Sequence, residues 1–295
     1  MPNWKELVEE IRTAGSTYDV VRRKQLEKLH EVTGRNVIIY YSGWLQKNAS
    51  NNEAVSLVDN DKNGFMAAIH QLDRSKGLDL FLHTPGGDLA ATESLVEYLR
   101  AMFGNDIRAF VPQLAMSAGT LIALSCKQIV MGKHSSLGPI DPQIFGLPAH
   151  GIIEEFRTAS EQVKKDAAII PLWQTIIGKY HPTLIGECQK AIAWSEQVAK
   201  EWLVSGMFAG DADADIKADK IVKELADHAL TKSHARHISM GKALDMGINV
   251  LNLESDPALQ EAALTVHHAC ILTLSATAAC KIIENQNGVA HIQTL

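Results

Sequence analysis

Thr84-Pro85-Gly86-Gly87-Asp88 and Ala115-Met116-Ser117-Ala118-Gly119-Thr120 are the two stretches that decide the fold of this 295-residue chain. The first is a glycine pair after an apolar run, where the backbone can turn sharply and leave N–H groups uncovered by side chains. The second places a lone serine at the start of an apolar helical pattern, beside unpaired N–H groups and the positive end of a helix dipole. Together they predict a nucleophilic serine next to an oxyanion hole.

Strands and helices alternate around these two stretches. Short apolar or β-branched runs bounded by turn residues predict buried strands at residues 36–41, 78–83, 107–111 and 128–131. Apolar residues at helical spacing predict helices at residues 64–74, 89–102 and 117–126. This alternation predicts an α/β fold in which crossover helices connect the strands of a parallel sheet.

Both ends of the chain have helical patterns. Residues 4–31 predict a helical pair, and long helices are predicted at residues 152–179, 183–203, 216–230 and 239–246. From Pro257 onward the sequence predicts one long helix followed by a frayed tail. We therefore expect an N-terminal helical segment at 1–33, a catalytic domain at 34–253 and a C-terminal helical extension at 254–295.

The composition narrows the class of protein. Hydrophobic residues make up 46% and charged residues 21% of the chain, as in ordinary globular proteins. The net charge of −6 and the lack of a long basic run argue against a nucleic-acid partner. The cysteines are far apart, which predicts buried reduced thiols, and the first residues indicate an amphipathic helix instead of a signal peptide. We expect a cytoplasmic protein without a membrane span, a metal or a cofactor.

The residues around the two stretches resemble a known family. HTPGGDLAATESLVEYLR and AMSAGTLIALSCKQIVMGKHSSLGPIDPQ resemble the serine dehydrogenase proteinase family, relatives of the signal-peptide-peptidase-type proteases within the Clp protease/crotonase superfamily. The resemblance is closest over residues 78–145 and extends more weakly over residues 36–285. It implies a Clp protease/crotonase-like spiral of ββα units, with additional N- and C-terminal helices.

The resemblance also implies roles for residues of the two stretches. Ser117 is the implied nucleophile, and the backbone N–H groups of Gly87 and Ala118 are the implied oxyanion donors. The neighbouring positions that we expect to bind substrate are Gly86, Asp88 and Met116.

The general base is left open by the sequence. Clp-type proteases use a histidine that would fall near Asp141, so this chain departs from that pattern, and Asp141 is expected to orient the base or the substrate. The signal-peptide-peptidase branch uses a lysine in a region where this chain offers Lys164 and Lys165. A lysine accepts the serine proton only when neutral, which requires burial; we favour Lys165, and two solvated lysines are the alternative. His83 and His134 are the nearest histidines and keep a histidine mechanism open.

These observations predict a serine endopeptidase that acts on a peptide or protein substrate through a Ser-Lys mechanism. Crotonase-like acyl-CoA chemistry is one alternative, because that superfamily uses the same pair of N–H groups. A catalytically silent scaffold that binds peptides or partners is the other. The amphipathic helices beyond residue 150 carry apolar stripes, from which we expect a homo-oligomer.

Overall fold

A seven-stranded sheet is the centre of the part of the chain that the computed structural model describes, residues 17–47, 52–226 and 236–295. Five strands run parallel in the order β10-β5-β3-β2-β1. They are β1 (Asn36–Ser42), β2 (Leu78–His83), β3 (Ile107–Val111), β5 (Gln128–Met131) and β10 (Val250–Asn252). The antiparallel strands β11 (Ala279–Asn285) and β12 (Ala290–Thr294) continue the sheet beyond β1. The parallel sheet predicted from the sequence is confirmed.

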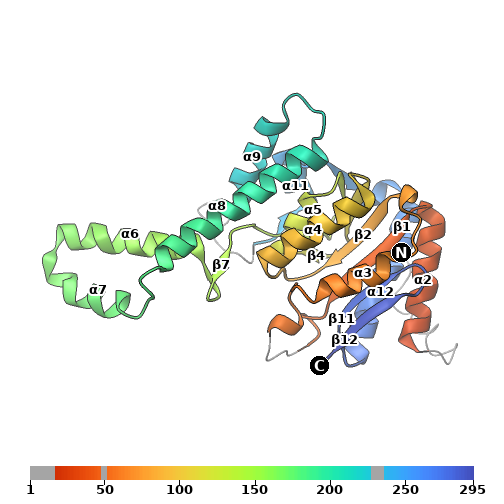
Figure 1. The fold of residues 1–295 in the computed structure, drawn as a ribbon, viewed down its shortest axis with the longest axis horizontal. Helices are drawn as coiled ribbons and strands as arrows, with labels where there is room; N and C mark the ends of the chain where they lie inside the picture. The colour runs from red at the N-terminus through yellow and green to blue at the C-terminus, as the bar shows by residue number, and fades with distance from the viewer. Residues whose placement is uncertain (1–16, 48–51, 227–235) are drawn as a thin grey trace.

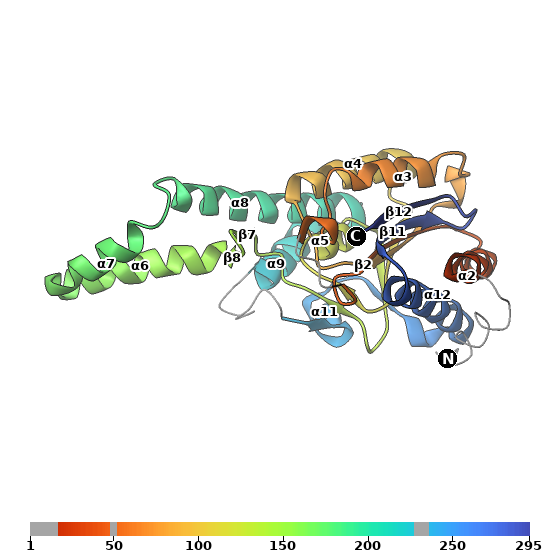
Figure 2. The same cartoon turned by 90° about the horizontal axis from the view of Figure 1, so that it is seen from below.

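Helices cover both faces of this sheet, which makes three layers (Figure 2). All residues of β1 are buried, and its side chains alternate between the two faces. Ile38 and Tyr40 face α3 (Asp61–Ile69), α4 (Leu89–Phe103) and α5 (Ala118–Leu124). Val37, Ile39 and Tyr41 face α2 (Tyr18–Thr33) and α12 (Pro257–Ala276). A strand that is buried on both sides reads as a continuous apolar run, and this pattern explains why the sequence identified it.

A second, smaller sheet begins where β3 ends. It contains β4 (Leu114–Ala115), β6 (Ser136–Leu137) and β9 (Ile238–Ser239), with β6 in the middle. The chain therefore turns out of the main sheet directly before Ser117 and returns to it in β5. The α11 helix (Met240–Met246) then leads from β9 to β10.

A helical extension projects away from the sheet (Figure 1). After the short strands β7 (Gln143–Ile144) and β8 (Leu147–Pro148), α6 (Ala149–Lys165) runs outward (Figure 1). The chain then turns, α7 (Ile170–Ile177) runs back alongside α6, and α8 (Leu184–Trp202) returns to pack against α9 (Ala214–Ala226) (Figure 1). The prediction of one helix over residues 152–179 is wrong. The chain breaks at Asp166, whose side chain accepts a hydrogen bond from the Ala168 N–H, and Pro171 lies in the first turn of α7.

The C-terminal residues also differ from the prediction. The α12 helix is confirmed, but the expected frayed tail is instead the hairpin β11–β12, in which every residue of β11 is buried. Two of these residues are charged, and they pair with residues far away in the sequence: Lys281 with Asp61 and Glu284 with Arg22. Charged positions inside a buried strand do not give an apolar pattern, which is why the strand was missed.

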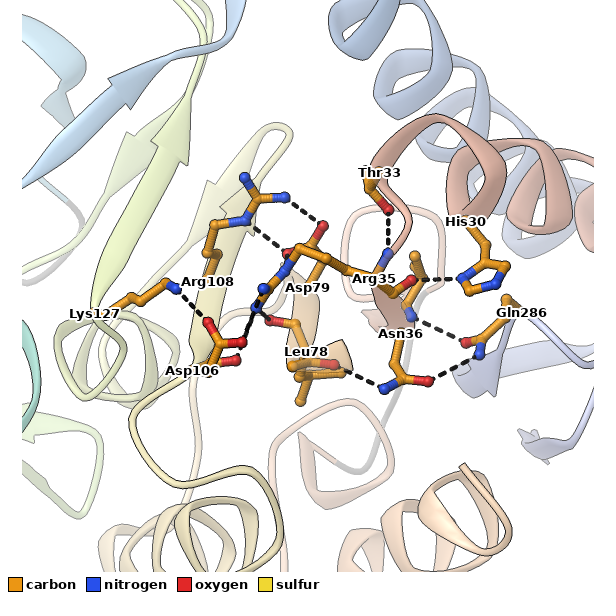
Figure 3. A network of polar contacts seen from close by, with 12 residues as sticks. His30, Thr33, Arg35, Asn36, Leu78, Asp79, Asp106, Arg108, Lys127 and Gln286 are labelled. Carbon is orange, nitrogen blue, oxygen red and sulfur yellow. Dashed lines mark hydrogen bonds and ion pairs between the residues drawn. The ribbon is translucent and has the colours of Figure 1, made fainter. Parts of the chain in front are cut away.

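An ionic network ties four parallel strands together at the edge where they begin (Figure 3). Arg108 donates two hydrogen bonds to the buried carboxylate of Asp79, at 2.7 and 2.8 Å, and Arg35 donates to Asp79 and Asp106. Lys127 pairs with Asp106 from the start of β5. These contacts fix the strands relative to one another, so that their opposite ends are also held in register.

The remaining predictions agree with the elements within five residues at each end; the largest difference is in α3, predicted to residue 74 and ending at Ile69. The helix expected at 216–230 is α9, described as far as Ala226, and residues 4–16 of the expected helical pair lie outside the described residues. The four cysteines are buried and unpaired, as predicted.

Candidate active site

The two stretches that decide the fold lie side by side at the carboxyl ends of the parallel strands. The Thr84 N–H donates to the Leu114 carbonyl, and the Met116 N–H donates to the Thr84 carbonyl, both at 3.0 Å. The glycine turn after β2 is thereby paired with the segment that leads to Ser117. A Cβ atom at Gly86 would lie only 2.7 Å from the Cβ of Ser117, so the two turns are in direct contact.

Ser117 has an unusual backbone conformation. Its φ is 50° and its ψ is −114°, a left-handed φ that favours glycine, and it is the residue directly before α5. Such a conformation in a residue with a side chain costs roughly 1–3 kcal/mol and persists only where the surroundings impose it. Here the Gly119 N–H donates to the Met116 carbonyl and the Leu121 N–H to the Ser117 carbonyl, and all of α5 is buried.

Ser117 borders a pocket of about 490 Å³. Four other parts of the chain complete its wall: the turn after β2, Trp44 with residues 55–56, residues 140–143 and the inner end of α8. The lining side chains are mainly apolar. They belong to Trp44, Val55, Ser56, Pro85, Gly86, Gly87, Asp88, Leu89, Ser117, Ala118, Leu121, Ile140, Pro142, Gln143, Ala191, Trp194 and Ser195.

Four of the five residues predicted for the oxyanion hole and for substrate binding line this pocket, and Met116 does not. Gly86, Gly87, Asp88 and Ala118 line it, and the carboxylate of Asp88 accepts a hydrogen bond from the Ala91 N–H at the start of α4. Met116 precedes Ser117 and is 9% exposed.

Asp141 lies just behind the wall. It is buried, between the lining residues Ile140 and Pro142. The Gly138 N–H donates to the Thr120 hydroxyl, which fixes this turn against α5.

The candidate lysines lie elsewhere. Lys164 and Lys165 are exposed in the last turn of α6, at the outer end of the helical extension (Figure 1). The ionisable side chain at the pocket is Asp88; no lysine or histidine lines it among the residues that the structure describes.

The candidate histidines also lie outside the pocket. His134 is exposed, whereas His83 is fully buried against the rings of Tyr41, Trp44 and His267, with ring centroids 4.4–5.5 Å apart. Neither ring nitrogen of His83 has a hydrogen-bond partner within the described part of the chain. Burial lowers the pKa of His83 to about 3, because the charged ring would lose its hydration.

Sequence reasoning missed the walls that come from distant segments. Trp44 follows β1, and Trp194 and Ser195 come from α8; the Ser195 hydroxyl donates to the Ile140 carbonyl at 2.7 Å. No local motif marks these residues, because each contributes through the path of the chain in space. The described residues contain no group of three or more side chains suited to a metal ion, and no helix among them is long and apolar enough to cross a membrane.

Comparison with known proteins gives one match to a family. The family of ClpP-like SDH-type serine proteinases matches residues 55–257. Its match, with the parallel sheet and flanking helices, identifies the fold as ClpP-like.

Individual relatives match this chain over only part of its length. The uncharacterized protein MJ1495 of Methanocaldococcus jannaschii is 30% identical over 190 residues, which cover 64% of this chain and 57% of that protein. The uncharacterized protein MJ0137 of the same organism is 36% identical over 110 residues, 37% of this chain and 38% of that protein. The chain thus spans little more than half the length of the first relative. Among solved structures, a mutant of a membrane-bound stomatin-specific protease is 19% identical, with a TM-score of 0.37 over 66% of this chain and 74% of that one.

Proposed function

Because the chain belongs to the family of ClpP-like SDH-type serine proteinases, we propose that it is a serine endopeptidase with Ser117 as its nucleophile. The observation that carries the proposal is the strained backbone of Ser117 at the wall of the apolar pocket, in contact with Gly86. In this mechanism the Ser117 Oγ bonds to the scissile carbonyl carbon and its proton passes through a base to the leaving amine. Water then hydrolyses the acyl-enzyme.

The oxyanion hole that we propose consists of the N–H groups of Gly87 and Ala118. The Leu57 N–H donates to the Gly86 carbonyl, and the Asp88 N–H donates to the Leu57 carbonyl. The Gly86 C=O and the Gly87 N–H belong to one planar trans peptide group and point in opposite directions, so this pairing directs the Gly87 N–H away from Leu57. Ala118 is the first residue of α5, where helical N–H groups have no partner within the helix. Two such donors stabilise the tetrahedral intermediate.

The substrate that fits this pocket is a peptide with an apolar side chain. Trp44 and Trp194 supply large apolar surfaces, and Leu89, Leu121 and Ile140 add further apolar side chains to the lining. Gly86, Asp88 and Met116 lie along the two paired turns, where backbone groups are suited to bind an extended peptide.

The base that we propose is Lys165, with Lys164 as the second candidate. Both are exposed at the outer end of the extension in the single chain, so a lysine that acts on Ser117 comes from a second copy of the protein. Docking against that copy also provides the burial that keeps a lysine neutral. In this arrangement Asp141 holds the wall at which the lysine arrives. The protein is then a homo-oligomer whose active sites form between subunits.

Mixing two inactive variants tests this arrangement. Ser117→Ala supplies the lysines without the nucleophile, and the double variant Lys164→Ala/Lys165→Ala supplies the nucleophile without the lysines. If the base comes from a second copy, dissociating and reassembling the two variants together restores part of the peptidase activity. A mixture as inactive as its components contradicts a lysine base supplied in trans.

Hydrolysis of an unfolded protein substrate tests the proposed activity itself. We expect the wild type to cleave denatured casein and Ser117→Ala to leave it intact, with the two proteins equally stable in urea. Cleavage that persists in Ser117→Ala contradicts the proposal.

A peptide-binding scaffold without catalysis is the second candidate function. It is favoured by one observation: the described residues place no lysine or histidine at the pocket. Crotonase-like acyl-CoA chemistry, which does not need the Ser117 hydroxyl, is the third. A wild type that binds apolar peptides without cleaving them supports the scaffold.

A further inference from the structure

A buried ion pair lies behind the oxyanion turn, defined as residues 86–88. The Lys281 ammonium is 2.8 and 3.0 Å from the two carboxylate oxygens of Asp61, and the two side chains are 0% and 1% exposed. Lys281 comes from β11, and Asp61 is the first residue of α3. Asp61 also accepts hydrogen bonds from the Tyr40 hydroxyl and from Gln293. The pair thus joins the inner antiparallel strand of the sheet to the start of a helix.

Both members of the pair hold the segment of residues 55–58, which we call the wall segment. Lys281 donates to the Ser56 carbonyl at 2.7 Å, and Asp61 accepts a hydrogen bond from the Val58 N–H at 3.1 Å. Val55 and Ser56 line the pocket. The ion pair therefore anchors the wall segment at two points, and the Ser42 hydroxyl, which donates to the Val55 carbonyl at 2.5 Å, anchors it at a third.

The wall segment in turn holds the oxyanion turn. The Leu57 N–H donates to the Gly86 carbonyl at 2.8 Å, and the Asp88 N–H donates to the Leu57 carbonyl at 2.9 Å. A Cβ atom at Gly87 would lie 2.2 Å from the Leu57 carbonyl oxygen and 2.4 Å from its nitrogen. Contact this close means that a displacement of Leu57 also displaces Gly87.

We infer that Lys281 and Asp61 are positioning residues that fix the Gly87 N–H for the oxyanion through the wall segment. This inference rests on the proposed function and extends it to β11, which lies outside residues 55–257 that the family model matches. A buried ion pair adds little net stability over a well-packed apolar pair, because both charges lose their hydration. Its fixed geometry suits a catalytic donor, since a misplacement of about 1 Å costs roughly 100-fold in rate.

The test compares variants that remove the Lys281–Asp61 ion pair with a control that weakens a different buried ion pair of β11. Lys281→Met removes the ammonium, and Asp61→Asn/Lys281→Met removes both charges so that no unpaired carboxylate is left buried. The matched control is Glu284→Gln, which weakens the other buried pair of the same strand, Glu284 with Arg22, away from the wall segment.

Two measurements separate the positioning of the oxyanion turn by the ion pair from its effect on catalysis. Amide hydrogen exchange at Leu57 and Asp88 reports whether the turn is held, independently of any activity. The rate of reaction of Ser117 with a fluorophosphonate, and kcat and KM for an apolar peptide, report on catalysis in samples shown to be folded.

We expect both Lys281 variants to exchange these two amides about tenfold faster than the control, as the local hydrogen bonds open more often. Labelling and kcat are expected to fall roughly 100-fold with KM little changed, while Glu284→Gln keeps the wild-type rates. If amide exchange at Leu57 and Asp88 is unchanged, the ion pair does not hold the oxyanion turn. If exchange is faster but Ser117 is labelled at the wild-type rate, the ion pair has no role in catalysis. A wild type that is neither labelled nor active overturns the proposed function instead, and the exchange result still decides whether the pair holds the turn.

Discussion

Lowering the pH from 7 to 4 is expected to cost the folded protein about 3 kcal/mol of unfolding free energy, because His83 is protonated in the unfolded chain and stays neutral in the folded one. The ring is fully buried, and neither of its nitrogens has a hydrogen-bond partner in the described part of the chain. Loss of hydration therefore lowers its pKa from the ordinary 6.5 to about 3. Protonating it in place puts a charge among the rings of Tyr41, Trp44 and His267.

The sign follows from where the proton binds. Between pH 6.5 and pH 3 the unfolded chain protonates this histidine and the folded chain does not, so acid favours the unfolded state. The stabilisation is complete above pH 6.5 and is lost at about 1.4 kcal/mol per pH unit as the pH falls towards 3. At pH 4 the loss is about 3 kcal/mol. His267, whose pKa burial also lowers, adds a loss of the same sign.

Urea unfolding at pH 7 and pH 4 measures this cost. His83→Gln replaces the ring with a neutral side chain of similar volume, and the fall in unfolding free energy should shrink by about 3 kcal/mol relative to wild type. Val130→Ala, a substitution in the core on the same face of the sheet, should lower stability equally at both pH values. If His83→Gln loses as much stability in acid as the wild type, the buried neutral histidine is not the cause.

Two further substitutions test the packing of the site and of the sheet. Gly87→Ala places a methyl group 2.2 Å from the Leu57 carbonyl oxygen, so we expect the reaction of Ser117 with a fluorophosphonate to slow roughly 100-fold, as for a displaced oxyanion donor. Gly186→Ala in α8, where the methyl group meets open space, should leave the rate unchanged, and equal rates in both variants contradict the proposed turn geometry. Asp79→Asn leaves Arg35 and Arg108 without their buried carboxylate, and urea unfolding should show a loss of about 3 kcal/mol, whereas Glu187→Gln in an exposed ion pair should cost less than about 1 kcal/mol. A loss for Asp79→Asn as small as that of Glu187→Gln contradicts the role of the network shown in Figure 3.

The sequence predicted those parts of the fold whose information is local. The parallel strands from β1 to β5 are apolar runs and the helices between them have apolar residues at helical spacing, so the residues of each segment predict its structure without knowledge of its partners. Ser117 and Gly87 were found because each lies in a short stretch at the end of a strand. The side-by-side placement of these stretches follows from the parallel sheet, in which adjacent strands end at one edge.

The parts that escaped prediction depend on contacts between distant segments. Lys281 and Glu284 in β11 have partners more than two hundred residues away, so the strand showed no apolar pattern. Trp194 joins the pocket because α8 returns from the extension. The base is the hardest to predict. Lys164 and Lys165 lie far from Ser117 in the single chain, so the proposed lysine base requires a second copy, which no local pattern encodes.

Reaction with a fluorophosphonate, followed by mass mapping of the modified residue, tests the central claim most directly. An activated serine forms a covalent phosphonate ester at Oγ, and an ordinary surface serine does not react at a comparable rate. We predict that the wild type gains one label, at Ser117, and that folded Ser117→Ala gains none. A folded wild type that stays unlabelled, or a label that persists in Ser117→Ala, would contradict the account of this protein as a serine peptidase with Ser117 as nucleophile.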